Sequence, residues 1–83
     1  MTSGDNTTRR GAGTGVDLLT ALVPEQRALL ERLAAGETIA AAAASEFMSL
    51  RTANRRMAEV RELFGVATSR EALSTYRALR DGG

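Results

Sequence analysis

The chain has 83 residues and a formal net charge of +1, from eleven basic and ten acidic side chains, and it contains neither cysteine nor histidine. A chain this short holds one domain at most, and without these two residue types it lacks the usual metal ligands and the usual general base. We therefore expect no enzyme activity and no cofactor. Because the net charge is small, any affinity for nucleic acid has to come from uneven placement of charge.

The N-terminal segment MTSGDNTTRRGAGTG is polar and rich in glycine and threonine, with no apolar periodicity. This composition predicts a disordered tail over residues 1–16, followed by one folded domain over residues 17–83. Arg9 and Arg10 in the tail fit either a basic arm that touches DNA or, more simply, a solvated tail. The chain has no apolar run long enough to span a membrane and no signal peptide at its start, which predicts a cytoplasmic protein without a membrane partner.

Apolar spacing predicts an all-α domain, with helices at about residues 24–35, 38–46, 49–63 and 69–80. Before the first of them, residues 16–23 are expected to form a short apolar turn or strap, which Asp17 would cap. The first helix begins at Pro24, buries Leu29, Leu30 and Leu33, and stops at Gly36. The second is capped by Thr38 and consists mainly of alanine, which favours a helix but buries little area.

The helix at 49–63 carries the clearest functional signal. An apolar stripe runs along one side of it and consists of Leu50, Ala53, Met57, Val60 and Phe64. Ser49 is the expected N-cap, and Arg51, Arg55 and Arg56 occupy other faces with no acid before Glu59. The short connection to the preceding helix is typical of a helix-turn-helix. Arginine clusters alone are usually just a solvated helix face, so this pattern is only a hint of nucleic-acid binding.

The last helix opens with a capping box formed by Thr68 and Glu71. Its apolar residues Leu73, Tyr76 and Leu79 share one face with Ala72. Two interpretations of this face remain open: it seals the core of the monomer, or part of it pairs two copies in a symmetric dimer.

From Leu22 to Leu73 the chain resembles, without a gap, the DNA-binding domain of the LuxR family, the GerE-type helix-turn-helix. The residues that carry the resemblance are Leu22, Pro24, Leu29, Leu30, Leu33, Ala35, Gly36, Thr38, Ala43, Met48, Ser49, Thr52, Phe64, Gly65, Val66, Glu71, Ala72 and Leu73. The joint spacing from Gly36 to Ser49 and from Thr52 to Gly65 is more specific than any single motif. The resemblance implies a four-helix domain that binds double-stranded DNA, with the 49–63 helix in the major groove.

Carried over residue by residue, the resemblance directs Asn54 and Arg55 at base edges and Thr52 at the DNA backbone. It makes Arg51 and Arg56 phosphate contacts. Asparagine can form a bidentate pair with adenine and arginine with guanine. The family also places subunit contacts on the last helix, which implies a homodimer through Leu73, Tyr76 and Leu79.

The sequence departs from the family pattern on two helices. Glu46 stands where the family has a buried leucine, so we expect either that Phe47 fills that space or that the helix is rotated. Ile39 and Ala40 replace the polar residues that in the family often donate to phosphate.

Three functions remain open. A sequence-specific DNA-binding transcription regulator is favoured. The alternative is a protein-interaction module that keeps the fold and binds a sigma factor or another regulator, because the second helix has lost its donors to the backbone. An enzyme subunit or small-ligand protein is the least favoured. Nothing in the chain resembles the receiver or autoinducer domain that normally precedes this module, so we expect its concentration or a partner to set its activity.

Overall fold

The computed structural model describes residues 18–82, and within this range the chain is helical and contains no strand. A helical turn at residues 18–21 leads into four longer helices. These are α2 (Pro24–Ala34), α3 (Ile39–Ser45), α4 (Leu50–Phe64) and α5 (Ser69–Gly82). The all-α prediction and the four predicted helices are confirmed, with ends that differ by only one or two residues. The proposed cap Asp17 and the arginines Arg9 and Arg10 lie outside the described residues.

The helix ends follow the local chemistry of the sequence. Thr38 accepts a hydrogen bond from the backbone N–H of Ala41 at 3.1 Å, and so caps α3. Ser49 caps α4 in the same way. At the C-terminal end of α4, Gly65 has a φ of +71°, the left-handed conformation in which glycine carries no Cβ penalty. These side chains satisfy backbone groups that would otherwise have no partner, so the helix ends are fixed locally.

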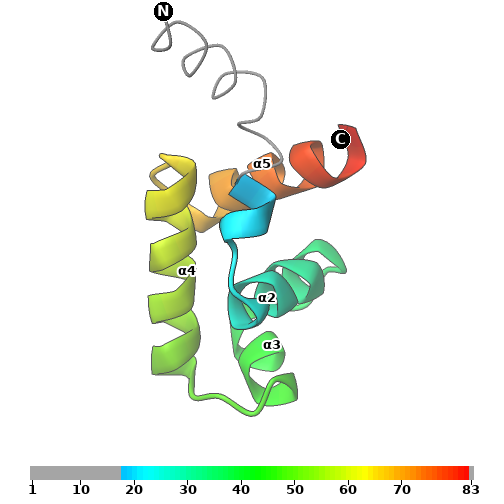
Figure 1. Cartoon of the computed structure of the whole chain (residues 1–83). Helices are drawn as coiled ribbons and strands as arrows, with labels where there is room; N and C mark the ends of the chain where they lie inside the picture. The colour runs from blue at the N-terminus through cyan, green and yellow to red at the C-terminus, as the bar shows by residue number, and fades with distance from the viewer. Residues whose placement is uncertain (1–17, 83) are drawn as a thin grey trace, which may run out of the picture.

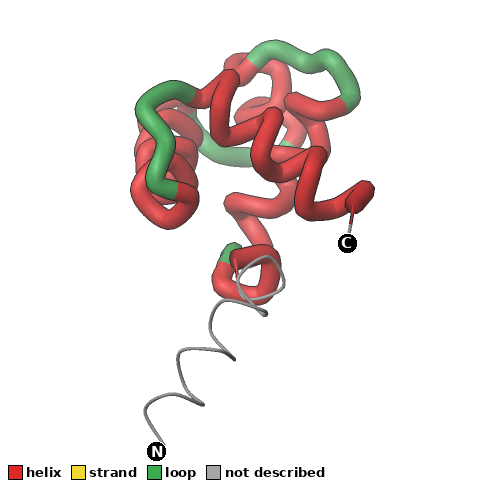
Figure 2. The backbone as a smooth tube through the Cα atoms, turned by 90° about the horizontal axis from the view of Figure 1, so that it is seen from above, coloured by secondary structure: helices red, strands yellow, loops and turns green. Residues whose placement is uncertain are grey.

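The four helices pack around a small core (Figure 1). In that view α4 stands upright beside α2 and α3, and α5 crosses the chain at the opposite end from the turn between α3 and α4. The view from above shows the helices surrounding one centre, with the loops on the outside (Figure 2). Helix α4 contacts α2, α3 and α5, so most of its length is supported from one side.

The core consists of one connected cluster of apolar side chains. Its buried members are Leu22, Leu29, Leu30, Ala42, Ala43, Ala53, Met57, Val60, Ala72 and Tyr76. The predicted stripe of α4 is therefore confirmed at its centre. It is wrong at Leu50, which is 47% exposed, and Phe64 is only partly buried against the cluster. Leu50 is the first residue of α4 and lies outside the core cluster of the described residues.

A polar cluster joins α2 to α5. The Tyr76 hydroxyl donates a hydrogen bond to the Glu31 carboxylate, which also pairs with the Arg80 guanidinium at 3.0 Å. The Arg80 guanidinium lies 5.6 Å from the centre of the Tyr76 ring. The hydrogen bond from Tyr76, followed by the one from Arg80, holds the pKa of Glu31 below its ordinary value of 4.5.

This lowered pKa predicts that part of the stability is lost in acid. A carboxyl whose pKa is lower in the folded state stabilises the fold above its unfolded pKa, and that contribution disappears as the pH falls through the lowered value. We expect Glu31→Gln to melt below the wild type near about pH 7, with the difference shrinking as the pH falls below the ordinary pKa of 4.5. Thermal unfolding followed by circular dichroism measures the melting temperature of each protein at each pH. The control Glu62→Gln, in an exposed carboxylate, should melt like the wild type throughout; a constant gap between Glu31→Gln and wild type would contradict the assignment.

None of the helices in residues 18–82 is both long enough and apolar enough to cross a membrane. The residues just before α2 cover one edge of the core: Leu22 is buried and Leu19 packs against the cluster. The expected apolar strap is therefore present over its described part, as a helical turn.

Candidate nucleic-acid interface

The N-terminal end of α4 is held by its own side chains. The Ser49 hydroxyl accepts from the Thr52 backbone N–H at 3.0 Å and also lies 3.0 Å from the Thr52 hydroxyl, to which it can donate. Thr52 is half-buried, and its hydroxyl is already engaged by Ser49 at the start of the helix. The predicted contact from Thr52 to a DNA backbone would use this same group.

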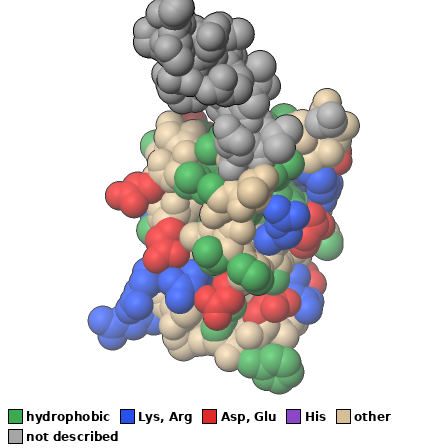
Figure 3. Space-filling model, viewed as in Figure 1, with side chains coloured by type: hydrophobic (Ala, Val, Ile, Leu, Met, Phe, Trp, Pro, Cys, Tyr) green, Lys and Arg blue, Asp and Glu red, His purple; other side chains and the backbone are tan. Residues whose placement is uncertain are grey.

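Beyond this cap, α4 presents an exposed polar and basic face. Arg51, Asn54 and Arg55 are all exposed, and their side chains make no hydrogen bond or ion pair with any other residue in the 18–82 range. Positions 51, 54 and 55 lie within about 100° of arc on a helix, since each residue advances the helix by roughly 100°. The space-filling view shows basic side chains gathered over the lower half of α4, with acidic ones above them (Figure 3).

Arg56 behaves differently from the other two arginines. Its Nε lies 2.6 Å from the Glu25 carboxylate at the start of α2, and its NH1 lies 3.2 Å from Glu59 one turn along α4. The hydrogen bond to Glu25, followed by the charge of Glu59, raises the pKa of Arg56. The sequence predicted a phosphate contact here, but a phosphate would have to displace two carboxylates. Arg56 instead ties α4 to α2.

Gln26 is a positioning residue that sequence reasoning missed. It is 7% exposed, its side-chain oxygen accepts from the Val23 backbone N–H at 2.9 Å, and its amide donates to Glu59 at 3.1 Å. Together with the Arg56 pairs, these bonds connect the first turn of α2 to the middle of α4. The available signal was that Gln26 lies on the same side of the first helix as its buried leucines. Helical periodicity alone does not distinguish such a glutamine from one that faces solvent.

The turn between α3 and α4 corrects one expectation. Phe47 does not fill the space at Glu46: its side chain is 98% exposed. The Glu46 carboxylate lies at the surface instead and forms an ion pair with Arg32 of α2, whose guanidinium also contacts Glu37 at 3.3 Å. The hydrogen bond to Glu46 raises the pKa of Arg32. A paired, partly solvated carboxylate avoids the cost of an unpaired buried charge, so Phe47 is not needed to fill the space at Glu46.

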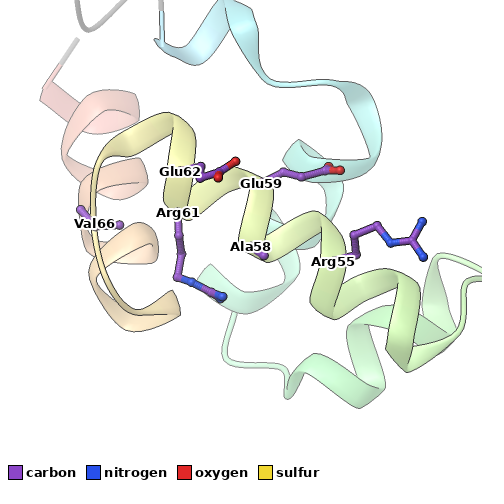
Figure 4. A pocket seen from close by; sticks show the side chains of 6 residues that line it. All are labelled: Arg55, Ala58, Glu59, Arg61, Glu62 and Val66. Atoms are coloured by element: carbon purple, nitrogen blue, oxygen red, sulfur yellow. The ribbon is translucent and has the colours of Figure 1, made fainter.

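A shallow hollow follows the exposed face of α4 towards its C-terminal end (Figure 4). Its lining residues are Arg55, Ala58, Glu59, Arg61, Glu62 and Val66. The charge therefore changes sign along this face: Arg51 and Arg55 lie near the N-terminal end, and Glu59 and Glu62 follow. Only the N-terminal half of α4 is suited to an anionic ligand. No group of His, Cys, Asp and Glu side chains within residues 18–82 is placed to hold a metal ion.

The predicted dimer residues on α5 differ in their exposure to solvent. Tyr76 is 2% exposed, so its side chain belongs to the core of the monomer. Leu73 and Leu79 are half-buried. The outward side of α5 is polar or small, at Arg70, Ser74, Arg77, Ala78 and Asp81. The Tyr76 side chain is already covered within one chain, so it offers almost no surface for a second copy.

No protein-family model, curated protein sequence or solved structure matches this chain.

Proposed function

We propose that this chain is a sequence-specific DNA-binding transcription regulator with a LuxR-like, GerE-type helix-turn-helix, and that α4 enters the major groove. The observation that carries the proposal is the set Arg51, Asn54 and Arg55, which are exposed and lack partners among the described residues. Unneutralised guanidinium groups on one end of a supported helix are suited to phosphates and base edges.

The dimensions and the chemistry agree with this role. An α-helix with its side chains is about 10–12 Å across, and the major groove of B-DNA is about 12 Å wide. Arg55 can pair in bidentate fashion with guanine and Asn54 with adenine, and Arg51, the second residue of α4, suits a phosphate. The ties from α2 through Gln26 and Arg56 would hold α4 in one orientation while it binds. A homodimer through α5 would rest on Leu73 and Leu79, since Tyr76 is buried.

A protein-interaction module is the second candidate function. The observation that favours it is the pair of exposed apolar side chains at the α3–α4 turn, Phe47 at 98% and Leu50 at 47% exposure. Ile39 and Ala40 also leave the start of α3 without side-chain donors for phosphate. Selection from a random DNA library with the purified full chain separates the two functions, because an enriched motif supports DNA recognition and a flat result favours the module.

Variants of the two arginines test the assignment of their roles. We expect Arg55→Ala to relax the preference at one base position, worth about 1–3 kcal/mol of discrimination. Arg51→Ala should weaken all sequences alike and reduce the salt slope by about 0.9. Affinities measured by fluorescence anisotropy over a range of salt concentrations give both quantities.

The matched control is Arg70→Ala, which removes an exposed arginine from the outward side of α5. It should leave base preference unchanged and affinity within about twofold. If Arg51 and Arg55 could both be replaced at a similarly small cost, α4 would not be the recognition helix.

A further inference from the structure

Large exposed hydrophobic side chains fall into two patches on the described surface. Val23, Phe47, Leu50 and Leu63 are the exposed ones among residues 18–82. Phe47 and Leu50 project from the α3–α4 turn and form what we call the knob. Val23 and Leu63 instead line a surface hollow, together with Ala21, Gln26, Glu59 and Glu62. The Phe47 side chain is 98% exposed on a turn, whereas Val23 and Leu63 line a hollow, so the exposed ring of one copy can enter the hollow of another.

The knob is held in place by the backbone. Phe47 has a φ of +58°, a conformation that costs free energy for any residue other than glycine and is tolerated best by asparagine. The turn is closed by bonds from the Phe47 N–H to Ala44 at 3.1 Å and from the Met48 N–H to Ala43 at 3.0 Å. The ring therefore projects from a fixed turn, although neither its exposure nor its backbone conformation benefits the isolated fold.

The charges around the two patches are complementary. From Phe47 to Ala58 the chain has no acidic residue, and Arg51 follows the knob directly. The hollow of Val23 and Leu63 contains Glu59 and Glu62. Glu59 is already engaged by Gln26 and Arg56, whereas the Glu62 carboxylate makes no hydrogen bond or ion pair with another side chain in the described part of the chain. An arginine beside the knob thus matches a carboxylate at the hollow.

A single chain cannot bring its own two patches together. Leu50 is the first residue of α4 and Leu63 lies at its other end. Thirteen residues of α-helix separate them by about 20 Å, since each residue adds 1.5 Å. The complementary partner for each patch is therefore the other patch on a different copy of the chain.

We propose that a second copy of this chain seats the Phe47–Leu50 knob in this hollow, with Arg51 against Glu62. The contact joins two different surfaces, so it is heterologous and links copies head to tail. It does not involve α5, and it does not depend on the proposed binding of DNA. The area of the two patches is small, so the association is weak and depends on protein concentration.

Sedimentation velocity of the full chain tests the proposal up to roughly 1 mM protein, the range in which weak contacts saturate. We expect the wild-type mass to rise with concentration and Phe47→Asn to remain a monomer. Asparagine tolerates the conformation at residue 47, so this variant should fold at least as stably as the wild type. The control Ala78→Asn, at an exposed position of α5 outside both patches, should associate like the wild type.

Charge reversal identifies the partner. Arg51→Glu and Glu62→Arg should each be monomeric alone, because each sets like charges against one another across the contact. A mixture of the two should associate again, since the intact knob of one fits the intact hollow of the other. The proposal is overturned by a monomeric wild type, by association that survives Phe47→Asn, or by a mixture that stays monomeric. A monomeric wild type whose affinity for DNA falls on Phe47→Asn substitution would assign the knob to DNA instead.

Discussion

Leu30→Ala is expected to unfold most of the protein at room temperature. The Leu30 side chain is fully buried, at 0% exposure, in the core between α2 and its neighbours. Truncating a buried leucine to alanine costs about 2–5 kcal/mol, through lost transfer free energy and the cavity that remains. A single core of this size rarely supplies more than about 3–5 kcal/mol of stability. The loss therefore approaches the whole free energy of unfolding, which urea titration followed by circular dichroism measures.

Leu63→Ala is the matched control, because it removes the same atoms from a side chain that is 36% exposed. Its effect on the free energy of unfolding should be clearly smaller. Equal midpoints for Leu30→Ala and the wild type would show that α2 does not bury this side chain. Phe64, only half-buried, is a weaker test of the core than Leu30.

Tyr76→Glu is expected to give an unfolded chain and not a folded monomer. Tyr76 is 2% exposed, and its hydroxyl donates to the Glu31 carboxylate. A glutamate at this position would place a carboxylate in the core, next to the exposed carboxylate of Glu31, and burial and like charge would both oppose its ionisation. Burying an ionised carboxylate without a partner costs several kcal/mol, comparable with the roughly 3–5 kcal/mol that a core of this size supplies. Helicity by circular dichroism and mass by light scattering, measured together, distinguish unfolding from dissociation.

Tyr76→Phe separates the hydroxyl from the ring. It keeps the packing of the ring and removes only the donor to Glu31, so we expect a loss of about 1–3 kcal/mol with the helicity retained. A Tyr76→Glu protein that kept its helicity and merely lost mass would place residue 76 at a subunit interface, contrary to its burial. A test of pairing through α5 therefore belongs at Leu73 or Leu79.

The helices were predictable because their signals are local. Pro24 opens α2, Thr38 and Ser49 cap α3 and α4, and Gly65 ends α4 in the left-handed conformation. Each signal acts through backbone groups within one turn of the residue that carries it. Periodicity likewise placed Met57 and Val60 in the core.

The structure differs from the predictions where the environment of a side chain depends on a distant part of the chain. Helical periodicity puts Leu50 on the buried stripe, but it is the first residue of α4, is 47% exposed and lies outside the core cluster. Glu46 is accommodated by Arg32, fourteen residues earlier in the chain. No local sequence pattern predicts this ion pair, because many surface arginines lie at comparable sequence separations from an acidic residue.

The same limit applies to the candidate site. The exposure of Arg51, Asn54 and Arg55 agrees with their place opposite the apolar stripe. The engagement of Arg56 by Glu25 depends instead on how α2 crosses α4. Side chains that face outward can thus be predicted from sequence. Ion-pair partners on another helix can be identified only when the packing of the helices is known.

The alanines where α3 meets α4 limit how this domain can change over evolution. Ala42, Ala43 and Ala53 are 0%, 2% and 0% exposed, so a larger side chain at any of them would push the two helices apart. The outward positions 51, 54 and 55 on α4 carry no such restriction. New binding preferences can therefore arise by substitution at these outward positions without loss of the fold. A combinatorial library that varies them while holding the three alanines should yield mostly folded members.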